Sequence, residues 1–178
     1  MKARIGGAIA ELLCIVMFLT LSIASSDAQS KVKWMKFGDA VKALQKEPRK
    51  IFVDIYADWC GWCKEMDKRT FSDTAIIRIL NRDYYPVKLN SDMRDTVSLG
   101  DRTVTYRELA SILGGERLGL PTSVFLNENG QLLSRLPGFQ KPDMMKPALL
   151  YFSRDVYKSK SWEVFHAEYT NRTKKNKR

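Results

Sequence analysis

The stretch Trp59-Cys60-Gly61-Trp62-Cys63-Lys64 decides the fold that we predict for this chain. It follows an apolar run, Ile51 to Ala57, which predicts a buried strand. The residues from Cys63 to Arg69 predict the first turns of a helix. Unpaired N–H groups and the positive dipole end at a helix start favour a thiolate, so we expect Cys60, at the exposed helix start, to be reactive. Cys63 lies three positions on, on the same helical face, and can close a disulfide onto Cys60.

The composition is that of an ordinary globular protein. The chain has 178 residues, of which 44% are hydrophobic and 28% charged, enough for one domain with a sizeable core. The formal net charge is +10, and part of it falls in residues 171–178, which we expect to be a basic, disordered tail. No nucleic-acid-binding motif accompanies this charge, and a basic tail alone does not predict a nucleic-acid partner.

Residues 1–28 have the pattern of a secretory signal peptide. Two basic residues precede a mostly apolar run from Leu12 to Ile23, and Ser26-Asp27-Ala28 resembles a cleavage site, with Ser22-Ile23-Ala24 as an alternative. The apolar run is shorter than the roughly 20 residues needed to span a bilayer, which favours a cleaved signal over a membrane anchor. We therefore expect an exported protein, periplasmic or otherwise outside the cytoplasm, with residues 29–36 as a linker.

Removal of this segment would also remove Cys14 and leave one cysteine pair, Cys60 and Cys63. Exported proteins keep disulfides, but a bridge across two residues closes too small a loop to add much stability. The pair is therefore better explained by chemistry than by structure. The alternative of a structural metal site is disfavoured, because zinc takes about four ligands and the only histidine, His166, is distant in sequence. We expect no metal, and His166 to be a surface or packing residue.

The rest of the chain predicts an α/β domain over residues 37–170. Asp39 and Asp73 are expected to cap two helices, and Thr105 with Glu108 forms a capping box for a third, which ends at Gly114-Gly115. Asn129-Gly130 predicts a hairpin turn, and residues 91–104 predict a loop. The spacing of Trp162, Phe165 and Tyr169 predicts a last helix docked on the body. The predicted helices are 40–46, 63–69, 74–81, 106–114, 143–153 and 161–169, and the predicted strands are 51–57, 85–90, 123–126 and 131–136.

Three separated motifs make this sequence similar to the thioredoxin family. Residues 53–64 resemble the family's active-site strand and helix, Gly119-Leu120-Pro121-Thr122 resembles its cis-proline loop, and residues 129–131 with 137–139 resemble its closing hairpin and the turn into the last helix. The resemblance covers about residues 35 to 155 and implies the thioredoxin fold, a mixed central sheet flanked by helices. The Gly-Trp spacer differs from the Gly-Pro of thioredoxin, and residues 90–119 are longer than in a minimal thioredoxin. Residues 60–66 and 70–73 look more like exported thioredoxin-like proteins of Gram-negative bacteria that support periplasmic disulfide reduction.

The resemblance also implies roles for the site residues. Cys60 is expected to be the attacking nucleophile and Cys63 the resolving thiol. Asp54 is expected to be buried, with a raised pKa, and to relay a proton to or from Cys63. The alternative is a carboxylate that faces solvent or pairs with Lys64 or Lys88.

Other residues are expected to surround the pair. Pro121 is expected to be cis and to pack opposite the disulfide, the alternative being a plain trans proline, and the backbone at Leu120 to pair with substrate. Trp59 is expected to pack over the cysteines, or to be a simple core aromatic. Trp62 is expected to be exposed and to contact substrate.

These features together predict a thiol–disulfide oxidoreductase that exchanges a dithiol for the disulfides of protein substrates, most simply as a reductase. We expect no dissociable cofactor, a membrane-bound or soluble thiol protein as electron donor, and a monomer. A disulfide oxidase or isomerase is the alternative within the same class. A thioredoxin-like binding module without turnover, such as a chaperone or thiol metal carrier, is the alternative from another class.

Overall fold

The computed structural model describes residues 31–116 and 118–175 of the chain. The predicted signal peptide, the first two residues of the predicted linker and the last three residues of the predicted tail lie outside the described residues.

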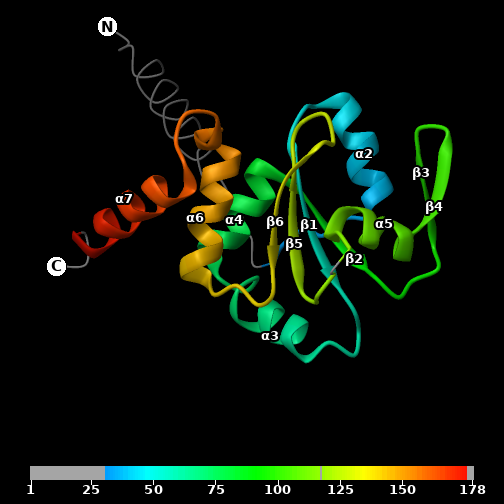
Figure 1. The fold of residues 1–178 in the computed structure, drawn as a ribbon, viewed down its shortest axis with the longest axis horizontal. Coiled ribbons are helices and arrows are strands. Elements are labelled where there is room, and N and C mark those ends of the chain that lie inside the picture. Colours follow the sequence, from blue (N-terminus) through cyan, green and yellow to red (C-terminus); the bar gives the residue numbers. More distant parts are fainter. Residues whose placement is uncertain (1–30, 117, 176–178) are drawn as a thin grey trace, which may run out of the picture.

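A four-stranded mixed sheet forms the centre of the fold (Figure 1). Its order is β2-β1-β5-β6, in which β1 runs parallel to β2 and antiparallel to β5, and β5 runs antiparallel to β6. The predicted mixed α/β architecture is therefore confirmed. The strands are β1 (Lys50–Tyr56), β2 (Tyr84–Asn90), β5 (Thr122–Leu126) and β6 (Leu132–Pro137).

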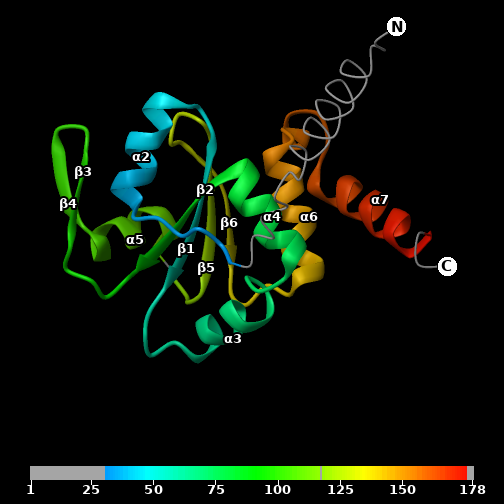
Figure 2. The same cartoon turned by 180° about the vertical axis from the view of Figure 1, so that it is seen from behind.

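Helices cover both faces of this sheet, as Figures 1 and 2 show from opposite sides. Alternate residues of β1 enter two different cores: Phe52 packs with α3, α4 and α6, whereas Val53 and Ile55 pack with α2 and α5. The face that carries Phe52 is thus the face covered by α3. The helices are α2 (Phe37–Lys46), α3 (Gly61–Arg69), α4 (Thr74–Asp83), α5 (Tyr106–Gly114), α6 (Pro142–Ser153) and α7 (Trp162–Lys175), with a short 3-10 helix η2 (Val156–Lys158).

Local capping interactions fix several element boundaries. The Asp73 carboxylate accepts hydrogen bonds from the first N–H groups of α4, and the reciprocal capping box of Thr105 and Glu108 opens α5. Both predicted caps are confirmed. The predicted cap at Asp39 is wrong, because α2 begins earlier, at Phe37, and Asp39 lies in its first turn. The buried Phe37 side chain makes this extra turn part of the core.

The predicted loop over residues 91–104 is also wrong in part. It contains a hairpin of two short strands, β3 (Thr96–Leu99) and β4 (Arg102–Thr105), which form a separate two-stranded sheet. Val97 and Val104 are directly paired and buried beside α2 and α5, while most of their neighbours face solvent. The hairpin therefore extends the core on the α2 and α5 side of the molecule.

The last helix docks as predicted, but the predicted linker and disordered tail are wrong in part. Helix α7 extends to Lys175, and Met35 of the predicted linker pairs with Val87 of β2. Phe165 is buried, and Trp162 and Tyr169 pack against the same core, which includes Tyr151 and Phe152 of α6. Among the described residues, no helix combines the length and apolar character needed to cross a membrane.

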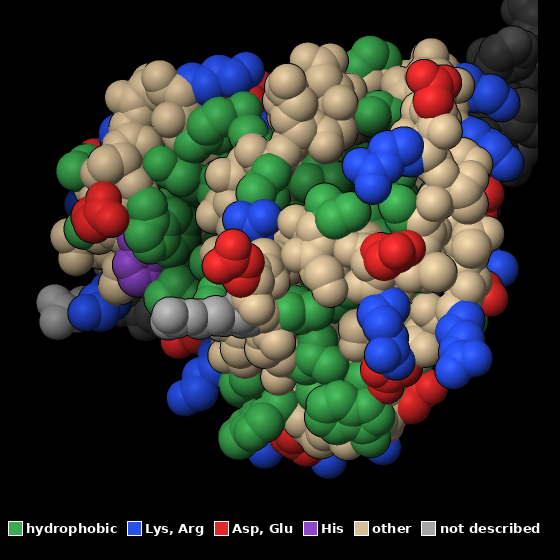
Figure 3. Space-filling view, turned by 45° about the vertical axis from the view of Figure 1, so that its right-hand side comes forward, with side chains coloured by type: hydrophobic (Ala, Val, Ile, Leu, Met, Phe, Trp, Pro, Cys, Tyr) green, Lys and Arg blue, Asp and Glu red, His purple; other side chains and the backbone are tan. Residues whose placement is uncertain are grey.

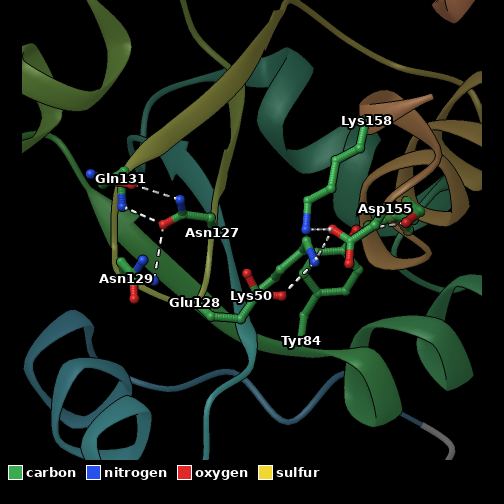
Figure 4. Close-up of polar contacts among 9 residues, drawn as sticks. Lys50, Tyr84, Asn127, Glu128, Asn129, Gln131, Asp155 and Lys158 are labelled. Carbon is green, nitrogen blue, oxygen red and sulfur yellow. Dashed lines mark hydrogen bonds and ion pairs between the residues drawn. The ribbon is translucent and has the colours of Figure 1, made fainter. Parts of the chain in front are cut away.

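An ionic cluster around the buried Lys50 joins three segments at the start of β1 (Figure 4). The Lys50 ammonium lies 2.5 Å from Glu128 in the β5–β6 turn and 2.9 Å from Asp155 in the turn after α6. Lys158 adds a contact of 3.2 Å to Asp155. Because the cysteine pair follows the other end of β1, this cluster supports the fold at a distance from the candidate site.

Candidate active site

The cysteine pair lies where β1 ends and α3 begins. Cys60 is the N-cap of α3 and its sulfur accepts a hydrogen bond of 3.1 Å from the Cys63 backbone N–H. The two sulfurs form a disulfide. A thiolate generated at Cys60 on reduction would face the positive end of the α3 dipole, which favours the charged form.

Both cysteines are more enclosed than the sequence suggests. Cys60 is only 4% exposed and Cys63 2%, so the expectation of an exposed Cys60 is wrong for the disulfide form. Ala57, Tyr56 and Leu120 pack against the two cysteines. The pair is therefore enclosed by the end of β1 and the loop before β5.

The loop before β5 places Leu120 and Pro121 at the cysteine pair. The Leu120–Pro121 peptide bond is cis, as expected, and Leu120 packs against the cysteines. The Pro121 carbonyl accepts a hydrogen bond of 2.7 Å from the Gly138 N–H, and the Thr122 hydroxyl donates one of 2.6 Å to the Gly119 carbonyl. These bonds hold the loop in place.

Asp54 lies inside the sheet and is tied to α3 through Lys88. Asp54 is 1% exposed, and its Oδ2 accepts a hydrogen bond of 2.7 Å from Lys88 Nζ. The same ammonium donates to Asp67 of α3 at 2.5 Å. Cys63 and Asp67 are four residues apart and share one face of α3, so the Lys88 bridge links that face of the helix to Asp54.

Burial perturbs the acid–base properties of Asp54 and Lys88. Desolvation raises the pKa of Asp54 to about 6, although Lys88 opposes the rise, and the Asp67 charge adds to it. Desolvation disfavours the charged form of Lys88, but the two carboxylates outweigh it and raise its pKa. Lys88 therefore stays charged, while Asp54 can gain or lose a proton near neutral pH. The predicted burial and raised pKa are confirmed, and of the two alternative partners Asp54 pairs with Lys88.

The aromatic residues beside the pair face outward. Trp59 is 72% exposed, and its indole Nε1 donates a hydrogen bond of 2.6 Å to Asp92, so the interpretation of Trp59 as a core aromatic is wrong. Trp62 is exposed, as expected, and its ring lies 5.6 Å from that of Phe139. Figure 3 shows hydrophobic side chains at the bottom of the molecule, the α3 end in Figure 1. An apolar segment of a partner could contact this surface.

Several residues of this site were not predicted from the sequence. Asp67, Asp92 and Phe139 are absent from the predicted set, and Lys88 enters it only as an alternative partner of Asp54. A lysine within the apolar strand that follows α4 was the available signal for Lys88. His166 stacks on Trp162 with ring centroids 5.1 Å apart, as a packing residue on α7. Within residues 31–116 and 118–175, no three His, Cys, Asp or Glu side chains are placed to hold a metal ion together.

This chain is similar in sequence to one protein family and to several known proteins. The family model Thioredox_DsbH, described as "Protein of unknown function, DUF255", matches residues 22–173. The thiol:disulfide interchange protein DsbD of Pectobacterium atrosepticum is 36% identical over 118 residues, which cover 65% of this chain and 18% of that protein. DsbD of Actinobacillus pleuropneumoniae is 30% identical over 155 residues, 75% of this chain and 25% of that protein. The chain thus spans a quarter or less of these relatives.

Solved structures support the fold. A thioredoxin-fold protein from Helicobacter pylori aligns with a TM-score of 0.59 and 15% identity, over 68% of this chain and 79% of that one. A thioredoxin from Thermus thermophilus aligns with a TM-score of 0.52 and 22% identity, over 71% of this chain and 87% of that one. The fold, the cysteine pair and the family match agree, and the chain belongs to the Thioredox_DsbH family and has a thioredoxin fold.

Proposed function

We propose that this chain is a protein-disulfide reductase that acts in an exported compartment. The observation that carries the proposal is the Cys60–Cys63 disulfide at the start of α3, with the cis-Pro121 loop on one side and the Asp54 carboxylate beneath α3. A structural disulfide would need none of these neighbours. A pair that alternates between dithiol and disulfide needs a stabilised thiolate and a group that exchanges a proton near neutral pH.

The reaction begins with the reduced pair. The Cys60 thiolate attacks a substrate disulfide, so that a Cys60–substrate bond forms and the first substrate sulfur leaves as a thiolate. Cys63 then loses its proton to the Asp54 carboxylate and attacks Cys60. The Cys60–Cys63 bond forms, the bond to the substrate breaks, and the second substrate sulfur leaves as a thiolate. The substrate gains two electrons and the chain becomes oxidised.

A thiol-protein electron donor reverses these steps and restores the dithiol. The DsbD relatives are named thiol:disulfide interchange proteins, which supports exchange with other thiol proteins. The exposed Trp59 and Trp62 and the backbone at Leu120 form the proposed substrate contact. We propose that the chain works as a monomer, with residues 1–28 removed as a signal peptide.

The first test is the reduction potential of the pair, measured by equilibrating the protein with dithiol buffers and counting alkylated thiols. A value near about −270 mV supports a reductase, whereas one near about −120 mV indicates an oxidase. Insulin reduction measures turnover. Cys60→Ser should abolish turnover, and Cys63→Ser should instead accumulate mixed disulfides between Cys60 and the substrate. A protein that forms neither trapped complexes nor reduced insulin would be a binding module instead.

A further inference from the structure

A row of three polar residues crosses the sheet beneath α3. Asp54 in β1 is directly paired with Lys88 in β2 on one side and with Ser123 in β5 on the other. Paired residues of neighbouring strands project to the same face of a sheet, with Cβ atoms about 5 Å apart across an antiparallel pair. Their neighbours on this face, Phe52 and Phe125, are fully buried. Ser123 is therefore a polar residue in an otherwise apolar setting, next to the one carboxylate of β1.

Two oxygens in this row are buried without a partner. Asp54 directs Oδ2 to Lys88, but its Oδ1 has no hydrogen-bond partner among the described residues. Ser123 is 0% exposed, and its Oγ likewise has no partner among residues 31–116 and 118–175. Leaving a buried polar group unpaired is costly, so two such groups on paired residues point to one shared interaction.

We propose that Ser123 is a positioning residue for Asp54. Its hydroxyl completes the hydrogen bonding of Asp54 Oδ1, directly or through one bound water, opposite the bond from Lys88 to Oδ2. A hydroxyl can donate to the carboxylate and accept from the carboxylic acid, so it serves both protonation states. Its bond to the ionised form is the stronger one, because charge assists it. Ser123 thereby keeps Asp54 ionised often enough to accept the Cys63 proton.

The charged and titratable groups around Asp54 are few. Lys88 of β2 contacts it directly, and Asp67 of α3 acts on it through Lys88. Cys63, also of α3, is bonded to Cys60 in the oxidised protein and does not titrate there. In that state a change in the Asp54 titration on substitution of Ser123 therefore reports on Asp54 itself. The inference rests on the proposed function only for the step in which Cys63 loses its proton.

The experiment follows the Asp54 side-chain carboxyl by carbon-13 NMR through a pH titration of the oxidised full chain, with Asp54→Asn to identify the signal. Ser123→Ala should raise the midpoint by about one pH unit, because a hydrogen bond to a charged group contributes at least about that much. Ser123→Thr, which keeps the hydroxyl, should restore the midpoint. Ser153→Ala is the matched control, since it removes another buried, unpartnered serine hydroxyl, on α6, and should leave the Asp54 titration unchanged.

An unchanged midpoint in Ser123→Ala would overturn the proposal, as would an equal shift in Ser153→Ala. Should Ser123→Ala not fold, Ser123→Cys keeps the volume with a weaker donor and should shift the midpoint in the same direction by less. The titration needs no substrate. If Ser123→Ala shifts the midpoint but the parent protein cannot reduce insulin, the role of Ser123 stands and the proposed reductase is refuted. If the parent protein reduces insulin but Ser123→Ala leaves the midpoint unchanged, the reductase stands and the role of Ser123 is refuted.

Discussion

Replacing Asp54 by asparagine should stabilise the oxidised protein at neutral pH. The native pKa of about 6 lies about two units above the ordinary value of 3.8, so ionising the folded protein costs about 3 kcal/mol more than ionising the unfolded chain. The asparagine side chain in the variant carries no charge and avoids this cost. The expected gain in the free energy of unfolding is about 2 to 3 kcal/mol, because Lys88 loses one charged partner but keeps Asp67.

The sign of the pH dependence follows from the raised pKa. The folded protein binds the Asp54 proton more tightly than the unfolded chain, so this carboxyl favours folding below about pH 4. That contribution is lost as the pH rises to about 6 and stays lost above it. The advantage of Asp54→Asn should therefore be small near pH 4, grow up to about pH 6 and then remain constant.

Urea unfolding of the oxidised protein, followed by tryptophan fluorescence from about pH 4 to neutral pH, measures the difference in the free energy of unfolding between Asp54→Asn and the parent protein. Asp39→Asn is the matched control, because Asp39 is an exposed carboxylate in the first turn of α2. Its effect on the free energy of unfolding should be small. The reasoning would be refuted if Asp54→Asn changed the stability equally at acid and neutral pH, since the carboxyl would then have no raised pKa in the folded state.

Three further predictions test the fold. Lys50→Ala should cost about 2 kcal/mol in urea unfolding, because it leaves Glu128 without its ion pair and Asp155 with Lys158 alone. Arg49→Ala, in a more exposed ion pair, should cost less than about 0.5 kcal/mol, and equal effects would contradict the role of the Lys50 cluster. Thr105→Ala should cost about 1 kcal/mol by removal of the capping box, and a stability equal to that of the parent would contradict it. Phe165→Ala should cost about 3 kcal/mol and increase hydrogen exchange in α7; unaltered exchange there would show that this contact does not hold the helix.

Much of the fold could be predicted because local signals coincide with it. The apolar run at 51–57, the caps at Asp73 and Thr105, and the Asn129-Gly130 turn each specify a boundary within a few residues. The β3–β4 hairpin was not predicted, because its sequence has no clear local signal. Each of its strands has four residues, of which only one is buried, against α2 and α5. A single buried residue in each short strand gives no alternation of polar and apolar residues that the sequence alone could show.

Part of the candidate site could likewise be predicted from local motifs, and part could not. Cys60, Cys63, Asp54 and Pro121 stand in short motifs, and their positions in the fold agree with those motifs. The partners of Asp54 depend on which residues of β2 and β5 lie beside it, and this register joins positions 34 and 69 residues away in the chain. A single sequence does not specify that register. The exposure of Trp59 also depends on a distant residue, because Asp92 holds its indole at the surface.

The two buried charge systems of β1 show how one strand serves stability at one end and chemistry at the other. At Lys50, burial opposes ionisation of Glu128 and Asp155, yet hydrogen bonds from Lys50 outweigh it and lower the pKa of both carboxyls. Their charges are permanent near neutral pH and hold the turns together. At Asp54, burial outweighs the single bond from Lys88, whose ammonium is shared with Asp67, and the pKa rises instead. Since a lysine is present in both places, the difference lies in how strongly burial acts on the carboxylate that the lysine contacts. A second ammonium bonded to Asp54 should lower the pKa of this carboxyl and so oppose the proton exchange proposed for Cys63.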